Sequence, residues 1–268
     1  TGGRAQTWVA ETVGADVSVG YTFHRPLDSD SWYAGYTAGY TWKAEDLHLV
    51  YDPNDPPPVI PTQGRFATLR AGWNYSSLRR FAYDVSVSEG VFLSLGVNGQ
   101  HEVLGSQFPA ISATWAFQTY VRMPWDRYHV LGLRYAGGLA GGQPGHRDLF
   151  AVGGFPESTI VDQLTSFSIY GGVALRGYPQ YFHTGTQYHL AQVEYRFPIW
   201  RMNAGVETLP FYLNRLYGNA FVGVGNAFSG AFDPALLLVG AGGELLLDFT
   251  VGYRLGFTFR FGVAPGFM

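Results

Sequence analysis

Residues 32–42 decide the fold class, because they read Trp-Tyr-Ala-Gly-Tyr-Thr-Ala-Gly-Tyr-Thr-Trp and change character at every step. The even-numbered positions are apolar or aromatic: Trp32, Ala34, Tyr36, Ala38, Tyr40 and Trp42. The odd-numbered positions are mostly small or polar: Tyr33, Gly35, Thr37, Gly39 and Thr41. Since successive side chains of a β-strand point to opposite faces, this stretch predicts a strand with one apolar face and one polar face.

The same alternation recurs along the whole chain, in segments close to the roughly 9–11 residues of a tilted membrane strand. The segments are 15–24, 66–76, 90–100, 109–122, 127–138, 187–198, 215–227, 235–249 and 253–264. Residues 4–13 could supply one strand more. We therefore expect about ten to twelve antiparallel strands.

The content and placement of charged residues distinguish a membrane barrel from a soluble sandwich. Only 14% of the residues are charged, whereas soluble domains carry about 25%. The charges in the strands fall on the face that holds Gly and Thr: Arg70, Arg122, Arg134, Glu194, Arg196, Glu244 and Arg260. A sandwich places its charges on the outward face. The pattern instead predicts an antiparallel transmembrane β-barrel, integral to the outer membrane of a Gram-negative bacterium, with lipid outside and water inside.

The alternation also predicts which residues contact lipid. They include Val19, Tyr21, Tyr36, Ala38, Leu69, Trp73, Leu93, Leu95, Phe257 and Phe259. No apolar run approaches the roughly 18 residues of a membrane helix, so strands must do the crossing.

Composition argues against several function classes. The net charge of -3 provides no basic surface for nucleic acid. The chain has no Cys, which excludes disulfides and thiolate chemistry, and its seven His lack metal-ligand spacing. No Gly-x-Ser-x-Gly motif is present. We expect no enzyme activity, no cofactor and no metal.

The connectors between strands are unequal. Two are long, at 44–63 and 139–186, while the turns near Trp125 and Thr250 are tight. Long connectors of such barrels are external and short turns are periplasmic. The stretch 77–89 is a medium-length exception on the turn side. We expect one barrel domain over residues 1–268, with 139–186 as its external loop.

Three short motifs follow one another around the long loop. They are Phe150-Ala-Val-Gly153-Gly154-Phe155-Pro156, Leu175-Arg176-Gly177-Tyr178-Pro179 and Gln192-Val193-Glu194-Tyr195-Arg196-Phe197-Pro198. In this order and strand context they resemble the bacterial surface antigen family, the outer-membrane assembly and translocation barrels that include the BamA-type insertases. The resemblance extends from about residue 60 to the end of the chain.

The resemblance implies that the Arg-Gly-aromatic tip, Arg176 to Tyr178, folds back into the barrel lumen. Alternation places Glu194 and Arg196 on the lumen face of their strand, and an unpaired charge there would be costly. The fork of Arg176 suits bidentate pairing with Glu194. We therefore predict a loop lock formed by Arg176 and Glu194, with Tyr178 packed on the inner wall.

One position departs from the family pattern. The next strand of the family carries Phe-x-Asp-x-Gly, whose Asp also receives the loop Arg. Here the strand reads Phe221-Val222-Gly223-Val224-Gly225, so Gly223 stands at the Asp position. Glu244, also on the lumen side, could substitute, and Gly223→Asp is expected to restore the missing carboxylate.

Both ends of the chain differ from a complete family barrel, which has roughly sixteen strands and both termini in the periplasm. Strand counting leaves the first and last confident ends on the external side. No final aromatic-ended strand is evident after 261–265. We interpret the chain as part of such a barrel, lacking its first strands and its last. The alternative is a smaller barrel closed from these strands.

The leading functional interpretation is a barrel that aids insertion or translocation of proteins at the outer membrane. Edge pairing at an opening seam would serve this role without a cofactor. Its partners would be membrane lipid, unfolded outer-membrane or secreted proteins, and periplasmic domains or accessory proteins. A passive pore is the alternative. A barrel enzyme would need a cluster of catalytic groups at the rim, and none can be assembled.

Overall fold

The computed structural model describes residues 8–46, 63–81, 84, 86–143, 146–154, 174–179, 182–205, 207–252 and 254–267. Most of these residues belong to antiparallel β-structure, and none of them forms an α-helix. Among the described residues, no helix has the length and apolar character needed to cross a membrane. The predicted all-β, antiparallel fold class is confirmed.

Ten strands pair in sequence to form the main sheet, in the order β1-β2-β3-β4-β5-β6-β9-β10-β11-β12. Their bounds are β1 (Trp8–His24), β2 (Ser29–Asp46), β3 (Gly64–Ser76), β4 (Gly90–Gln100), β5 (Ala110–Arg122), β6 (Val130–Gly142), β9 (Gln187–Gly205), β10 (Phe211–Phe228), β11 (Leu238–Val251) and β12 (Leu255–Val263). A short strand β13 (Gly266–Phe267) also pairs with β11. Strands β7 (Phe150–Val152) and β8 (His183–Gly185) form a separate two-stranded sheet.

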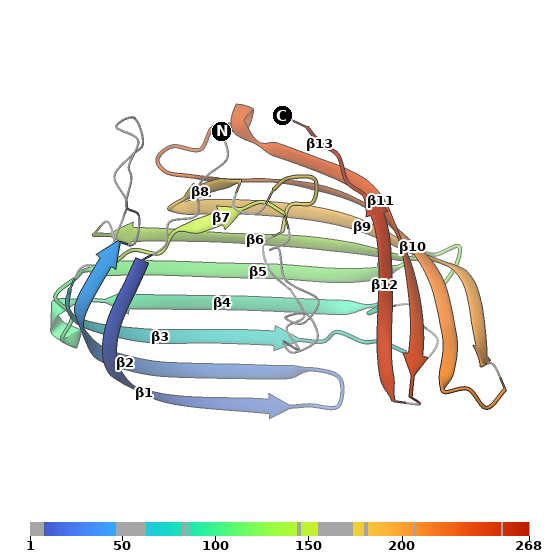
Figure 1. Cartoon of the computed structure of the whole chain (residues 1–268), viewed down its shortest axis with the longest axis horizontal. Coiled ribbons are helices and arrows are strands. Elements are labelled where there is room, and N and C mark those ends of the chain that lie inside the picture. Colours follow the sequence, from blue (N-terminus) through green and yellow to red (C-terminus); the bar gives the residue numbers. More distant parts are fainter. Residues whose placement is uncertain are drawn as a thin grey trace.

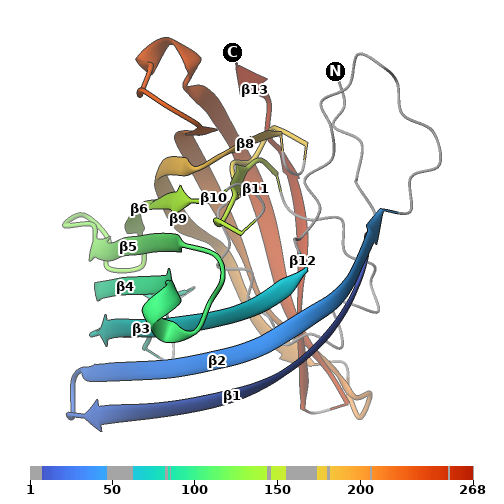
Figure 2. The same ribbon diagram turned by 90° about the vertical axis from the view of Figure 1, so that its left-hand side faces the viewer.

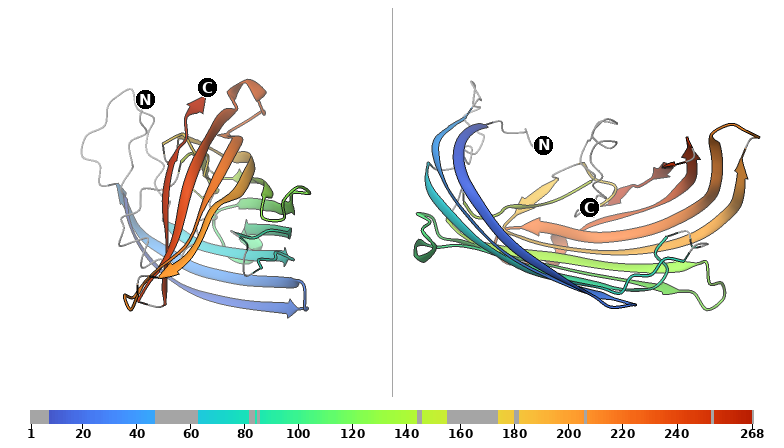
Figure 3. Two further views of the ribbon diagram at one scale, coloured as in Figure 1. Left: turned by 90° about the vertical axis from the view of Figure 1, so that its right-hand side faces the viewer. Right: turned by 90° about the horizontal axis from the view of Figure 1, so that it is seen from below.

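The main sheet is strongly curved and forms an open trough (Figures 1 and 2). Strands β1 to β6 form one part of the wall, and β10 to β12 rise steeply at the other end. Within the described chain, β1 and β12 are the two edges of the sheet and do not pair with each other. The small β7–β8 sheet lies on the concave side (Figure 3). The concave face is therefore the lumen face of an unclosed barrel wall.

Strand register sorts the side chains into two faces, as the alternation predicts. Trp32 lies opposite Trp73, and Trp73 lies opposite Leu95, so the apolar set shares one face across three strands. On the other face, Arg70 of β3 pairs with Asp16 of β1. The apolar face is exposed: Val19 retains 71% of its surface and Phe259 retains 62%.

Several sequence-based strand bounds were wrong, among them the end of the strand predicted at 187–198, which continues to Gly205 as β9. Residues 8–13 do not make a separate strand, because β1 continues from Trp8 to His24 and absorbs a register shift between Glu11 and Thr12. The long connector does not begin at residue 139, because β6 extends to Gly142. Ladder pairing with β5 holds this Gly-rich end in a strand, because Gly142 lies opposite Ala110. Partner strands, rather than local composition, determine these bounds.

Long and short connectors lie at opposite edges of the sheet. Strands β2 and β6 end, and β3 and β9 begin, at one edge of the sheet, where η1 (Glu102–Leu104) and η2 (Pro234–Leu236) also lie. The turns β1–β2, β5–β6, β9–β10 and β11–β12 lie at the other edge, together with the connector 77–89. We call these the loop side and the turn side. The first residue of β1 and the last of β12 are both on the loop side.

The best-packed apolar core lies on the concave face. It joins residues of the β6–β9 connector to the inner wall: Ala136, Val152, Leu175, Tyr188, Leu190, Ala227 and Leu238. Leu175 and Val152 have no exposed surface at all. Burial of such side chains stabilises each by about 1.5–3 kcal/mol, so the connector is fastened to the wall by packing as well as by charge.

Candidate functional site

The loop tip, residues 174–179, is pinned to the start of its own connector. The backbone N–H of Leu175 donates to the carbonyl of Gly153 at 2.6 Å, and that of Gly154 donates to the carbonyl of Pro179 at 2.9 Å. An isolated β-bridge joins Gly153 to Ala174. Gly153 and Gly154 thus clamp both sides of the tip. Phe155 and Pro156 of the same motif lie outside the described residues.

Arg176 reaches two carboxylates on the inner wall. Its Nη2 lies 2.8 Å from Oε1 of Glu194 on β9, and its Nη1 lies 3.5 Å from Oε2 of Glu244 on β11. Its guanidinium carbon stands 4.2 Å from the ring centroid of Phe221 on β10. Only 13% of the Arg176 side chain is exposed, with 14% for Glu194 and 8% for Glu244. This shielded arrangement, which we call the loop-tip site, spans three adjacent strands.

Glu194 binds a second arginine as well. Its Oε2 accepts from Nη2 of Arg196 at 2.6 Å, two residues along the same face of β9. Arg196 also donates to Ser86 Oγ at 2.9 Å and lies over the ring of Tyr120. Glu194 therefore bridges Arg176 and Arg196, and two arginines balance the two carboxylates.

Two glycines allow the tip backbone to approach the wall. Gly177 has φ +101°, which L side chains rarely adopt, and a Cβ there would stand 2.7 Å from the carbonyl oxygen of Pro265. A Cβ on Gly240 of β11 would stand 2.0 Å from the carbonyl oxygen of Arg176. No side chain fits in either gap without backbone movement. The absence of a side chain at both glycines allows the tip backbone to reach the inner wall.

Tyr178 closes the tip against β11 and β13. Its hydroxyl accepts the N–H of Val239 at 3.1 Å and lies within donating reach of two carbonyls, those of Val239 at 3.0 Å and Phe267. Its ring packs near Phe182, with centroids 5.1 Å apart. The apolar body and polar end of Tyr178 are both engaged on the inner wall.

The space next to Gly223 is occupied by an apolar side chain. A Cβ at Gly223 would stand 3.0 Å from Cδ1 of Leu175, which is fully buried. The expectation that Gly223→Asp restores an acceptor stays a prediction, and it requires the end of the Leu175 side chain to move by a few tenths of an ångström. Glu244 supplies the second carboxylate from the next strand instead, as the lumen-side alternation allowed.

The remaining motif residues, Phe197, Pro198 and Gly225, lie in strands β9 and β10 of the wall. Phe197 packs outward beside Tyr195, with ring centroids 5.8 Å apart. Pro198 lies in β9 beyond Arg196, the last residue that pairs with β6, so its missing N–H breaks no ladder bond on that side. Gly225 lies opposite Leu190, where a Cβ would stand 2.5 Å from the carbonyl oxygen of His189. These three residues shape the strands.

Three supporting residues were not predicted from the sequence. Gln192 donates from Nε2 to the carbonyl of Ala174 at 2.6 Å, and Asn219 donates from Nδ2 to Glu244 at 3.2 Å. Leu175 fills the core beneath the tip. Gln192 and Asn219 lie on the lumen face of their strands, as Glu194 and Glu244 do, so the alternation of the sequence could have identified them. No local signal marks Leu175.

A second group of buried charges occupies the turn side of the lumen. Asp84 and Ser88, which lie between β3 and β4 in the sequence, are buried there and hydrogen-bond to each other. Arg122 of β5 approaches Asp84 at 3.4 Å and Ser88 at 3.0 Å. Arg215 of β10 donates to the backbone carbonyl of Asp84. We call Asp84, Ser88, Arg122 and Arg215 the turn-side cluster.

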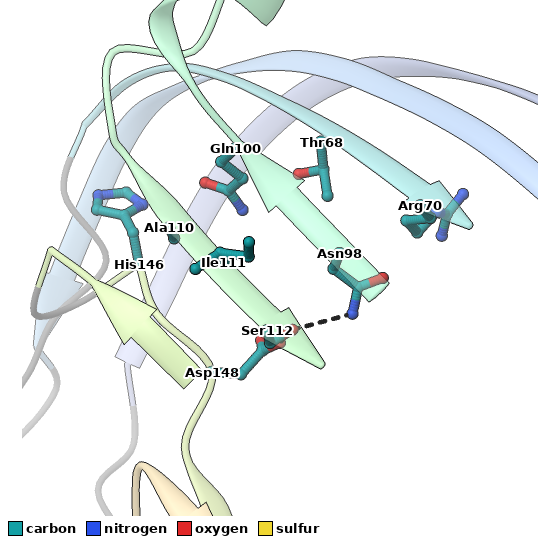
Figure 4. A pocket seen from close by; sticks show the side chains of 9 residues that line it. All are labelled: Thr68, Arg70, Asn98, Gln100, Ala110, Ile111, Ser112, His146 and Asp148. Atoms are coloured by element: carbon teal, nitrogen blue, oxygen red, sulfur yellow. Dashed lines mark hydrogen bonds between the residues drawn. The ribbon is translucent and has the colours of Figure 1, made fainter. Parts of the chain in front are cut away.

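A small polar cavity lies on the loop side of the same face (Figure 4). Its volume is about 150 Å³. Strands β3, β4 and β5 and the start of the β6–β9 connector line it, through Thr68, Arg70, Asn98, Gln100, Ala110, Ile111, Ser112, His146 and Asp148. The described residues contain no group of three or more metal-ligating side chains, here or elsewhere.

Comparisons with known proteins support the fold. No family model and no curated protein matches the sequence. Among solved structures, 57 chains match the fold. One is BamA from Haemophilus ducreyi lacking POTRA domains 1-3, with 14% sequence identity and a TM-score of 0.55. The match covers 97% of this chain but only 55% of that one. The chain therefore has the fold of part of a BamA-like barrel and spans about half the length of that relative.

Proposed function

We propose that this chain forms part of the wall of an outer-membrane barrel that aids insertion or translocation of proteins. The observation that carries the proposal is the loop tip bound inside a BamA-like sheet through Arg176 and Glu194, at 2.8 Å. A loop seated on three strands narrows the lumen, which argues against a wide and permanently open pore.

The apolar convex face supports a membrane location. Large apolar side chains stand exposed along strands at both edges and in the middle of the sheet, among them Val17 at 74%, Leu95 at 51% and Phe261 at 66%. Soluble proteins rarely expose continuous apolar surfaces of more than a few hundred Å². Lipid would cover this face, and the polar concave face would meet water.

Paired substitutions on neighbouring residues of β4 test this placement. Leu95→Lys puts a charge into lipid and should destabilise the folded protein by about 2–4 kcal/mol. Gly96→Ser is the matched control, because its new side chain enters the lumen beside Thr114 Oγ1. Urea unfolding in lipid vesicles measures both. Equal tolerance of the two changes would refute the assignment of faces.

The functional test uses the full protein in lipid vesicles that receive a urea-denatured outer-membrane barrel as substrate. Folding of the substrate is followed by its gel mobility. The wild type should accelerate folding, and Arg176→Gln should reduce the acceleration while its β-sheet circular dichroism is retained. Arg70→Gln is the control, because Arg70 is also a lumen arginine but is 42% exposed and paired with Asp16. No acceleration by the wild type would refute the proposal.

The same vesicles separate an assembly barrel from a passive pore. The apolar core between the connector and the wall fills part of the lumen, so we expect little steady ion conductance. Large, constant conductance together with unassisted substrate folding would favour the pore. No step of the proposed function needs a cofactor, because strand pairing and packing supply the interactions.

A further inference from the structure

A groove of about 490 Å³ lies on the convex face, over the neighbouring strands β1 to β4 (Figure 1). Its floor is formed by two small side chains, Ala34 of β2 and Ala71 of β3, which lie opposite each other. Val19 of β1 and Val97 of β4 continue the same row on either side. Volumes of about 300–1,000 Å³ are typical of small-molecule sites, and this apolar lining suits an acyl chain.

Two tryptophans and a carboxylate stand at the turn-side end of the groove. The rings of Trp32 and Trp73 lie with their centroids 5.9 Å apart, and Nε1 of Trp73 donates to Oδ1 of Asp30 at 3.3 Å. Asp30 precedes Trp32 by two residues and therefore lies on the same face of β2. Tryptophans gather at the membrane–water interface, and a charged side chain on this face avoids the bilayer interior. Asp30 therefore lies at the level of the lipid headgroups, and Ala34 lies roughly 13 Å further along the strand, at the level of the acyl chains.

The charges at this end form a small group of both signs. Arg25, in the turn between β1 and β2, pairs with Asp28 through Nε and with Asp30 through Nη2. All three side chains reach the surface, with 44% of Arg25, 26% of Asp28 and 21% of Asp30 exposed. One guanidinium faces two carboxylates, so the group has an excess of negative charge. It can accept hydrogen bonds from an ammonium, which has three N–H donors, while Arg25 donates to a phosphate.

We propose that this groove binds one phosphatidylethanolamine molecule of the periplasmic leaflet. Its ammonium would lie on Asp28 and Asp30, its phosphate beside Arg25, and one acyl chain over Ala34 and Ala71. A choline headgroup has no N–H to donate, and a glycerol headgroup brings a negative charge without an ammonium, so both fit this charge group less well. The inference rests on the membrane placement of the convex face in the proposed function, because the turn side of such a barrel is periplasmic.

The test is photolabelling of the whole chain in phosphatidylcholine vesicles that contain a small fraction of a lipid with a diazirine in the middle of one acyl chain. Three probes share the same chains and differ only in the headgroup: ethanolamine, choline or glycerol. After illumination, peptide mass spectrometry locates the labelled residues. Labelling around Ala34 and Ala71 by the ethanolamine probe should saturate and exceed that by the choline probe about fivefold, as for an exposed ion pair at the upper end of its range. The glycerol probe should label the groove least.

Two sets of variants test the two ends of the site separately. Ala71→Phe should remove the saturable labelling, because the ring fills the floor of the groove. Val193→Phe is its control, since Val193 is an exposed residue of the convex face on β9, away from the groove. Ala34→Leu replaces Ala71→Phe if that variant loses its β-sheet circular dichroism.

The headgroup end is tested by Asp28→Asn combined with Asp30→Asn. This double variant should lower labelling by the ethanolamine probe to the level of the choline probe and leave choline labelling unchanged. Asp126→Asn is the control, because Asp126 is an exposed carboxylate of the β5–β6 turn on the same side. Equal labelling of the groove by all three probes, or strongest labelling by the glycerol probe, would overturn the proposal. Absence of label from the whole convex face would instead overturn the membrane placement itself, so the two failures are distinguishable.

Discussion

The loop-tip site and the turn-side cluster both hold largely shielded arginines on the concave face, but they differ in how many arginines meet how many acidic residues. At the loop-tip site one arginine, Arg176, is held by two carboxylates from two strands. At the turn-side cluster one residue, Asp84, receives two arginines, Arg122 through its carboxylate and Arg215 through its backbone carbonyl. The first arrangement fastens a loop to the wall, and the second fastens a connector between two distant strands.

The two regions differ in which ion-pair partners remain after one charged residue is removed. Without Arg176, Glu244 keeps only the neutral Asn219 among the partners described for it. Without the Asp84 carboxylate, Arg122 still has Glu89 at 3.5 Å, and Arg215 still has Asp248 at 2.9 Å. Each arginine of the turn-side cluster therefore keeps a carboxylate, and at the loop-tip site Glu194 keeps Arg196. The comparison singles out Glu244 as the carboxylate that loses its described arginine when Arg176 is removed.

The largest effect is expected for Arg176→Gln. Breaking a buried ion pair costs about 3–5 kcal/mol. We expect a loss toward the lower end of this range, because Glu194 keeps Arg196 while Glu244 loses its described arginine. Arg70→Gln is the control, and its exposed pair should contribute only about 0–1 kcal/mol. Urea titration of both variants in detergent measures the free energy of unfolding. Similar losses in the two variants would show that shielding at the loop tip has no energetic consequence.

Gly177→Ala tests whether the close approach of the tip backbone to the wall stabilises the protein as much as the ion pairs of Arg176 do. A left-handed backbone costs an L residue about 1–2 kcal/mol, and the collision with Pro265 adds to this, so we expect about 2–3 kcal/mol in total. Gly252→Ala is the control: its φ is +63° and nothing lies within 4 Å of a new Cβ. That variant should show the backbone cost alone, toward the lower end of about 1–2 kcal/mol. An equal cost would mean that the tip can shift away from the wall freely.

Asp84→Asn tests whether the remaining carboxylates support the arginines of the turn-side cluster. The neutral side chain keeps its shape but loses the charge that Arg122 faces, so we expect a loss of about 1–2 kcal/mol. Thermal unfolding in the same detergent measures it. A loss as large as that of Arg176→Gln would contradict the distinction between the two regions, because the alternative partners Glu89 and Asp248 would then contribute nothing.

The smallest expected effect is the difference between the coupling energies of Arg176 with the two carboxylates of the loop-tip site. Double-mutant cycles pair Arg176→Gln with Glu194→Gln and with Glu244→Gln. The coupling to Glu194, at 2.8 Å, should lie toward the upper end of about 0.5–3 kcal/mol, and the coupling to Glu244, at 3.5 Å, near its lower end. The reverse order would mean that Glu244 is the main acceptor and that Glu194 mainly serves Arg196.

Sequence alone determined the strands, their two faces and the members of the charged pair. Alternation is a local property with a period of two residues, so it can be read without knowing any partner strand. It placed Glu194 and Glu244 on the polar face, and the motif around Arg176 indicated which loop would meet them. The same logic would have added Gln192 and Asn219, which lie on that face.

Only the tertiary structure decided the contacts that join distant segments. Leu175 occupies the space at Gly223, and Asp84 meets Arg215 from 131 residues away. The ends of β1 and β6 likewise follow their partners rather than their own residues. Such contacts depend on the curvature of the sheet and on the path of connectors. No periodicity in the sequence encodes either, because both result from the packing of segments that are far apart in the chain.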